Sequence, residues 1–366
     1  MEQIIEKRER SLTPDICKGV AILLVVWGHV LQQGLLGIAD IHENPVVKLI
    51  YSFHMPLFVL ISGYFFYASQ KKRSIKEIIV QRSKNLLKII LIWNTIHFVV
   101  SLLFNCLIEK QGSFSIKSWW QAIIEGYWFL WAMLFCTITV GFIVKNLPIQ
   151  FWILGFVAVV PLALISPCRW VILSVYPFYI AGFLFHKWIE EGKKIPVWLK
   201  YCSLPVFVVA TGIHFSGSAV GNSEWMYLVK KVLGYLKGSV GLTDIMLQVR
   251  NVVLYYILGI SGSVSVIILV DVFVRKVKKN VVWNYVGKLG QFSLQIYILQ
   301  RVLLELILGK CYGMLVRVIG KNPIVNNISM FTWVYSFLIS VICIYLLYLL
   351  ISYVLKGKVS CALFGR

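Results

Sequence analysis

The chain alternates long apolar runs with short polar connections, and the runs have the length that a membrane crossing requires. About 20 predominantly apolar residues cross the hydrocarbon layer as a helix, which satisfies its own backbone polar groups there. The runs lack the period-two alternation of transmembrane barrel strands. The pattern predicts an all-α, polytopic integral membrane helix bundle of about ten transmembrane helices. We expect these spans at 16–36, 47–68, 85–107, 122–145, 150–166, 169–187, 200–216, 250–274, 284–309 and 331–355.

The basic residues predict how the bundle is oriented, because cytoplasmic segments of membrane proteins are rich in Lys and Arg. With the N-terminus inside, twenty-two Lys and Arg residues fall on inner segments and eleven on outer ones. We therefore expect an N-in, C-in arrangement, which an even number of spans requires. The first run follows basic residues, as in a signal peptide. It is long and contains Trp27 and His29, so we interpret it as a retained span.

The longest connection covers 217–249, which is amphipathic and rich in glycine. Such a segment is typical of an interfacial helix or a lid. We find no internal repeat, whereas an inverted-repeat transporter carries paired interrupted helices in its two halves. The length leaves no room for a large soluble domain, so we expect one transmembrane domain over 1–366.

The composition indicates a membrane protein and argues against nucleic acid as a binding partner. Of 366 residues, 59% are hydrophobic and 14% charged, against about 45–50% and about 25% in soluble domains. The formal net charge of +21 would suggest nucleic acid in a soluble protein, but basic cytoplasmic loops explain it here. The eight cysteines are scattered without a CxxC pair, so neither a disulfide framework nor a metal site is indicated.

Two histidines stand out, because ionisable residues inside a span are costly and often functional. His29 lies eleven residues after Lys18 in the first span, about 16 Å deeper along a helix and on nearly the same face. His54 lies at a similar depth in the second span, which a short connection joins to the first. The two imidazoles can form one site suited to proton transfer. The alternative is that each merely bonds to a neighbouring helix.

Other polar positions within or beside the spans admit two interpretations each. Asn94 and His97 are more typical of bonds between helices, and Trp128 is typical of an interfacial aromatic belt. Arg301 and Glu305 are four residues apart, which suits either an ion pair or a polar group facing a substrate. Arg82 and Lys84 belong to a basic cluster near the inner surface that can hold anionic lipid or a phosphorylated ligand. Both interpretations of each feature stay open at this point.

These residues carry a resemblance to a family. The first span resembles the opening signature of the membrane-bound acyltransferase 3 family through Asp15, Lys18, Gly19, Gly28 and His29. The second span resembles the family's second motif through Phe53-His54-Met55-Pro56-Leu57-Phe58 and Ser62-Gly63. Weaker matches are Arg82, Trp128-Phe129-Leu130, Tyr176-Pro177-Phe178 with Gly182, and the late segment from Gly290 to Tyr297. Their order agrees with the family over nearly the whole chain.

The chain departs from the family's pattern at two places. Many members carry Arg where this chain has Lys18, and Lys cannot form the bidentate fork of Arg. In this respect the chain resembles the fucose 4-O-acetylase-like branch. The late helix of many members ends in Tyr-x-x-His, where this chain has Gln300. A proton role at that position in relatives does not carry over.

The resemblance implies an O-acetyltransferase of the bacterial plasma membrane that moves an acetyl group from cytoplasmic acetyl-CoA to a carbohydrate hydroxyl. The acceptor it implies is a surface polysaccharide or a lipid-linked sugar, and no bound cofactor or metal is expected. We expect His29, His54 and Lys18 to be catalytic, with His29 as base or transient acyl carrier. We expect Arg82, Lys84 and Asp15 to bind the donor.

Trp128, Arg301 and Glu305 are the residues expected to contact the acceptor. Two other classes of protein compete with this interpretation. A transporter or flippase of a glycan or small molecule would transfer no acyl group. In a non-catalytic receptor or scaffold, the paired histidines and the basic mouth would be incidental.

Overall fold

The computed structural model describes residues 12–35, 44–70, 72–107, 110, 113–148, 169–216, 221, 223–276, 281–310 and 330–365. Within these ranges the chain is helical and contains no strand. Among the described residues, eight helices are long and apolar enough to cross a membrane. The all-helical class is thus confirmed for the described part of the chain. The span expected at 150–166 lies outside it.

The first half of the bundle begins with α1 (Thr13–His29) and the π-helical segment η1 (Val30–Leu35). It continues with α2 (Pro45–Gln70), α3 (Ile75–Leu107), the short α4 (Ile116–Glu125) and α5 (Trp128–Asn146). The second half contains α7 (Arg169–Glu190), α8 (Val197–Phe215), α9 (Glu224–Leu236) and α10 (Leu242–Lys276). The last helices are α11 (Val281–Gln291), α12 (Ser293–Gln300), η4 (Arg301–Leu308), α14 (Met330–Leu349), η5 (Leu350–Val354) and α15 (Lys358–Phe364).

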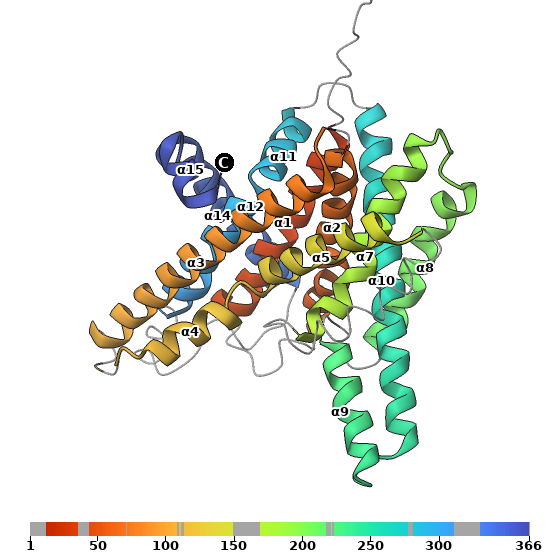
Figure 1. Cartoon of the computed structure of the whole chain (residues 1–366), viewed down its shortest axis with the longest axis horizontal. Helices are drawn as coiled ribbons and strands as arrows, with labels where there is room; N and C mark the ends of the chain where they lie inside the picture. The colour runs from red at the N-terminus through yellow and green to blue at the C-terminus, as the bar shows by residue number, and fades with distance from the viewer. Residues whose placement is uncertain are drawn as a thin grey trace, which may run out of the picture.

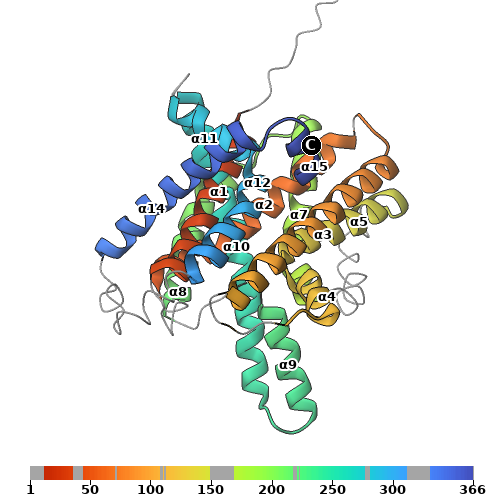
Figure 2. The same ribbon diagram turned by 90° about the vertical axis from the view of Figure 1, so that its left-hand side faces the viewer.

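Helices α1 and α2 form the centre of the molecule (Figures 1 and 2), because both bury most of their length against neighbours. Helix α2 packs against α7, α10 and α1, and α1 also packs against α11. Glycines allow these close contacts. A Cβ on Gly63 or Gly182 would overlap the backbone of the other helix of the α2–α7 pair, and one on Gly19 or Gly290 would do the same between α1 and α11. Small residues at crossings let membrane helices approach to backbone contact.

Two of the expected spans are interrupted rather than continuous. The segment expected at 122–145 breaks at Gly126 and Tyr127, between α4 and α5. The segment expected at 284–309 divides into α11, α12 and η4. Both interruptions place irregular backbone inside the bundle, which membrane proteins tolerate where it is buried in protein or lines a cavity.

The described part of the long connection after α8 contains α9, which forms a helical hairpin with α10, and this hairpin projects from the bundle in both views (Figures 1 and 2). Helix α9 packs along the beginning of α10. Lys231 of α9 pairs with Asp244 of α10 at 3.3 Å. The 35 residues of α10 span about 52 Å at 1.5 Å per residue, more than the ~30 Å hydrocarbon layer. Helix α10 is therefore longer than one crossing of the hydrocarbon layer requires.

The beginning of α1 and the end of the chain lie at the same end of the bundle. Lys18 of α1 and Gly365 line one cavity together with Arg82 and Asn85 near the beginning of α3. Trp93 of α3 donates a hydrogen bond from Nε1 to the carbonyl of Leu363 in α15. We refer below to this end as the basic end and to the other as the hairpin end.

Candidate functional site

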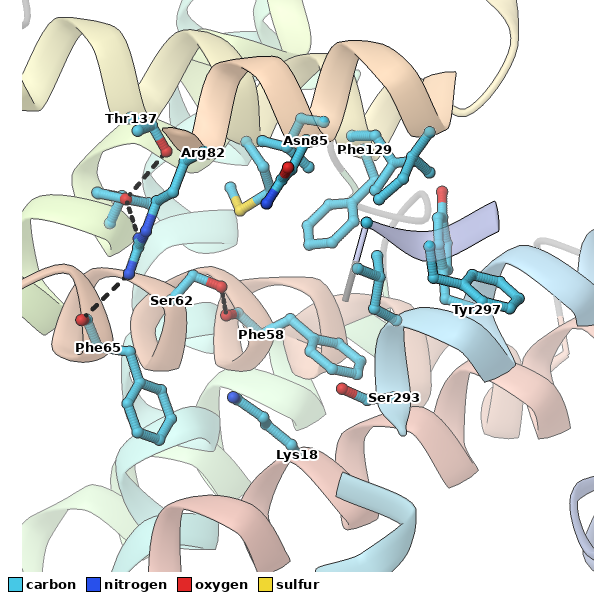
Figure 3. Close-up of a pocket in the computed structure, with 18 of the residues that line it drawn as sticks. Lys18, Phe58, Ser62, Phe65, Arg82, Asn85, Phe129, Thr137, Ser293 and Tyr297 are labelled. Carbon is cyan, nitrogen blue, oxygen red and sulfur yellow. Dashed lines mark hydrogen bonds between the residues drawn. The ribbon is translucent and has the colours of Figure 1, made fainter. Parts of the chain in front are cut away.

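A cavity of about 450 Å³ opens near the basic end, and we call it the inner cavity. Its polar wall carries Lys18 and Arg82 (Figure 3), with Ser62, Ser69, Thr137 and Tyr179 around them. Its deeper wall is apolar and includes Phe58, Phe129 and Met133. The shape suits a ligand with an anionic group at the mouth and an apolar or neutral extension reaching inward.

Arg82 is held in place before any ligand arrives. Its guanidinium donates to the Phe65 carbonyl at 3.2 Å (Figure 3). It also donates to Ser69 Oγ at 3.0 Å and to Tyr179 OH at 3.4 Å. Tyr179 OH in turn lies 3.2 Å from Thr137 Oγ1. This network joins α3 to α2, α7 and α5, so one cation is fixed where four helices meet. Lys18 completes the basic wall, with Nζ 4.0 Å from the centre of the Phe65 ring.

A second cavity of about 270 Å³ lies further toward the hairpin end, and we call it the outer cavity. It contains both histidines predicted to share a site, His29 from the end of α1 and His54 from α2. The other lining residues are Val25, Gln32, Tyr51, Met55, Trp128, Tyr255, Tyr297 and Arg301. Tyr51 OH donates to Gln32 Oε1 at 2.9 Å. Imidazole, amide, phenol and guanidinium groups around an aromatic side chain are suited to binding a polyhydroxylated ligand.

The tautomer of neutral His54 follows from its hydrogen bond. Its Nδ1 lies 2.6 Å from the carbonyl oxygen of Ile50, one turn earlier in α2. A carbonyl only accepts, so Nδ1 carries the hydrogen and donates. In the neutral ring, Nε2 is then the basic nitrogen. Only 5% of His54 is exposed, and the ring of Tyr51 packs edge-on against it at 5.0 Å. The ring is thus fixed with one basic nitrogen.

The break between α4 and α5 places Trp128 at this cavity and Tyr127 beside its lining residue Arg301. Tyr127 adopts a left-handed backbone with φ of 44°, which costs a non-glycine residue free energy and is often found at functional sites. Its fully buried ring lies under the Arg301 guanidinium, 4.6 Å from it, and its hydroxyl donates to the Ile298 carbonyl at 3.0 Å. Asn94 and Trp131 both donate to the Ile123 carbonyl near the break.

The two cavities follow one another along the bundle. Of the described residues, Met55 and Tyr297 line both of them. Met55 comes directly after His54 in α2, and Tyr297 lies in α12, one turn before Arg301. The structure therefore places a cationic inner cavity and a histidine-containing outer cavity on either side of these two side chains.

The structure groups most of the predicted site residues, although not all in the expected place. Lys18 and Arg82 lie in the inner cavity, whereas His29, His54, Trp128 and Arg301 lie in the outer one. Lys84 is exposed on α3 and lines neither cavity. Asp15 is 1% exposed and accepts from Gln291 Nε2 at 3.2 Å, so it faces α11 rather than either cavity. The side chain of Glu305 lies outside what the structure describes.

Sequence reasoning did not select Gln32, Tyr51 or Tyr255, which also line the outer cavity. Tyrosine near the end of a span is usually an interfacial residue, so composition offered no signal for it. Within the described ranges, no three His, Cys, Asp or Glu side chains are grouped to hold a metal ion.

Comparisons with known proteins agree on one family. A family profile described as "Acyltransferase domain" matches residues 12–357. Two curated relatives are both named nodulation protein NolL. The one from Mesorhizobium japonicum is 29% identical over 57% of this chain and 56% of its own length. The one from Sinorhizobium fredii is 34% identical over 54% of each chain. The chain thus matches about half the length of these relatives, and no solved structure matches it.

Proposed function

Because the chain belongs to the acyltransferase 3 family, whose domain covers residues 12–357, we propose that it is a membrane O-acyltransferase. In this proposal it moves an acetyl group from cytoplasmic acetyl-CoA to a hydroxyl of a cell-surface or lipid-linked carbohydrate. Its place is the bacterial plasma membrane, with the basic end in the cytoplasm. Acetyl-CoA is a substrate here and not a resident cofactor.

One observation carries the proposal, namely the order of the two cavities. A donor with anionic phosphates requires fixed cations at the cytoplasmic surface, and Lys18 and Arg82 line the inner cavity. An acceptor hydroxyl is a poor nucleophile and requires a general base, and the imidazoles of His29 and His54 line the outer cavity. Met55 and Tyr297 touch both spaces. A thioester entering from the basic end meets a hydroxyl held among histidines at this boundary.

The donor binds through groups that the structure fixes in advance. Guanidinium groups hold phosphate oxygens with charge-assisted hydrogen bonds, and three existing bonds already orient Arg82. Lys18 supplies a second cation across the cavity. Lys84, exposed on the same helix as Arg82, adds positive charge along the approach. Asp15 supports the donor site indirectly, by fixing α1 against Gln291 of α11.

The proposed reaction has one bond forming and one breaking. His29 removes the proton from the acceptor hydroxyl, whose oxygen attacks the thioester carbonyl carbon. The new C–O bond forms, the C–S bond breaks, and the CoA thiolate leaves and takes up a proton from water at the inner mouth. His54, with its basic Nε2, receives the proton from His29 and releases it to water, which returns both imidazoles to their neutral forms and balances the proton that the thiolate takes up. Such acid–base catalysis contributes about 10²–10⁴-fold.

The acceptor occupies the outer cavity. Aromatic side chains such as Trp128 bury the apolar face of a sugar ring, and Tyr51 and Gln32 hydrogen-bond to hydroxyl groups. Arg301, stacked on Tyr127, supplies a cation for an anionic sugar or a lipid-linked phosphate. We also propose Glu305, four residues after Arg301 in η4, as an acceptor contact.

The test measures O-acetyl groups on glycans of the source cells. Four strains are compared: gene intact, gene deleted, and deletion restored with either His29→Ala or the matched control His214→Ala. His214 is 1% exposed and lines neither cavity. Loss of O-acetyl groups on deletion, restored by the His214 variant but not by the His29 variant, supports the proposal. Restoration by His29→Ala excludes the role of that residue.

Unchanged acetylation in all four strains would contradict carbohydrate acylation and favour the transporter alternative. In that case the deletion strain should accumulate a glycan or small molecule on one side of the membrane. Protein level in the membrane, measured by immunoblot, controls for misfolding of either variant.

A further inference from the structure

Met55 and Tyr297 lie at the boundary between the two cavities. Both line the inner and the outer cavity. Under the proposed function, the thioester sulfur arrives from the inner side and the acceptor oxygen from the outer side. The acyl carbonyl must therefore lie between the cavities, and any carbon atoms beyond it must fit against these two side chains or enter the acceptor space.

Aromatic rings restrict the space around this boundary. The ring of Tyr297 packs edge-on against Phe129 at 5.5 Å and against Tyr127 at 6.1 Å. Phe129 packs in turn against Phe58 at 6.2 Å. Close-packed side chains have low compressibility, so these rings are not easily displaced by a bulky ligand. Met55 is the flexible member of this wall, and thioether side chains adapt to irregular gaps.

We propose that Met55 and Tyr297 form an acyl-length filter that admits a two-carbon acyl group and rejects longer ones. This inference rests on the proposed function and adds the determinant of donor specificity to it. The outer cavity, of about 270 Å³, must hold the acceptor ring. A longer acyl chain therefore competes with the acceptor for this volume, unless the side chains of the filter leave space for its extra carbon atoms. One methylene more or less in such a pocket changes selectivity by about 10–200-fold.

The chain offers a matched pair of methionines for the test. Met55 and Met133 are 6% and 7% exposed, and both line the inner cavity. Only Met55 also lines the outer cavity. Replacing either by Ala removes the same atoms from the same degree of burial. A change in acyl selectivity that occurs only in Met55→Ala therefore arises at the boundary between the cavities. It does not arise from a general loosening of the inner cavity.

The experiment uses membranes from the deletion strain restored with wild type, Met55→Ala or Met133→Ala. Each preparation receives an equimolar mixture of acetyl-CoA and butyryl-CoA, and mass spectrometry measures O-acetyl and O-butyryl groups on the endogenous acceptor. We expect the butyryl-to-acetyl ratio to rise by about tenfold or more in Met55→Ala. In Met133→Ala the ratio should stay within about twofold of wild type, even where the total rate falls.

A ratio unchanged in Met55→Ala, or raised equally in both variants, would overturn the filter while leaving the acyltransferase proposal intact. Absence of transfer from either donor by wild-type membranes would instead overturn the proposed function. If Met55→Ala reaches the membrane but is inactive, Met55→Leu replaces it. The filter then predicts an intermediate ratio, and a wild-type ratio in an active Met55→Leu enzyme contradicts it.

Discussion

At the scale of single residues, the fixed tautomer of His54 leads to a sharp prediction. Asn at position 54 can keep a donor near the Ile50 carbonyl, 2.6 Å from Nδ1 in the native ring, but it has no atom equivalent to Nε2. We expect His54→Asn to fold normally and to lower kcat by about 100-fold or more, since proton transfer is lost. Initial rates with acetyl-CoA, together with a thermal melt in detergent, measure both effects.

The control for this variant is His214→Asn, because His214 is buried outside both cavities. Its rate should equal that of wild type. Near-normal turnover in His54→Asn would show that Nε2 takes no part in the reaction, and the outer cavity would then rely on His29 alone.

Spacing along two neighbouring spans was enough to predict that His29 and His54 lie close together, and both line the outer cavity, because their positions along the two spans place them at a similar depth. Spacing was not enough to place Asp15 and Lys84, neither of which lines the inner or the outer cavity. Both lie in short basic or acidic stretches near Lys18 and Arg82, but helix rotation points Asp15 toward Gln291 and leaves Lys84 exposed. Rotation at a helix end depends on the helices packed around it, which a single sequence does not show.

At the scale of helices, the family-like glycines acquire a packing role. A Cβ on Gly182 would overlap the backbone of Leu60 in α2. We expect Gly182→Ala to push α7 from α2, displace Tyr179 from Arg82 and destabilise the fold by about 1–3 kcal/mol, the usual cost of overpacking. Gly212→Ala in α8 is the control, since nothing lies within 4 Å of a Cβ there. We expect a lower melting temperature for Gly182→Ala than for Gly212→Ala. Equal melting temperatures would exclude a close backbone contact at Gly182.

The hairpin of α9 and α10 should respond to pH through Glu224, which lies outside the candidate spans. Burial raises the pKa of its carboxyl, although hydrogen bonds from the Gly221 N–H and Gln248 Nε2 oppose the shift. A raised pKa means that docking favours the neutral carboxyl. Its contribution is therefore complete below the ordinary Glu pKa and is lost as pH rises through the raised value.

Hydrogen–deuterium exchange of α9, corrected for intrinsic rates, tests this linkage. We expect stronger protection at about pH 5 than at about pH 8. Glu224→Gln keeps an acceptor oxygen without a charge, so its protection should not depend on pH. An equal pH dependence in the Gln variant would assign the effect to another group.

The break between α4 and α5 shows why interrupted helices were missed. The apolar run through 122–145 continues across Gly126 and Tyr127, so hydropathy predicts one span. The turn depends on Asn94 and Trp131, which donate to the Ile123 carbonyl, and on Gly126, whose Cβ would overlap Asn94. Asn94 is distant in sequence from the break, and its partner becomes visible only in the folded bundle.

At the scale of the whole molecule, apolar run length was sufficient for the class, because the cost of unpaired backbone in lipid allows few alternatives. Eight spanning helices are found among the described residues, against about ten expected. The difference consists of the segment at 150–166, which the structure does not describe, and the late segment divided into α11, α12 and η4. A hydropathy profile measures the length of an apolar run and does not detect a turn inside that run.

The orientation of the protein in the membrane decides whether a cytoplasmic donor can reach the inner cavity. Lys18, Arg82 and Gly365 line one cavity, so the basic end carries both the beginning of α1 and the end of the chain. The excess of Lys and Arg on these segments predicts that this end is cytoplasmic. The tip of the hairpin, around Gly238, then faces outward.

Reporter fusions separate the two possible orientations. Green fluorescent protein fused after Arg366 should fluoresce, because it folds in the cytoplasm, whereas alkaline phosphatase inserted at Gly238 should be active, because it requires the oxidising exterior. The reverse combination would place Lys18 and Arg82 outside. A cytoplasmic donor could then not reach the inner cavity, and the proposed direction of acyl transfer would fail even if every catalytic residue were correctly assigned.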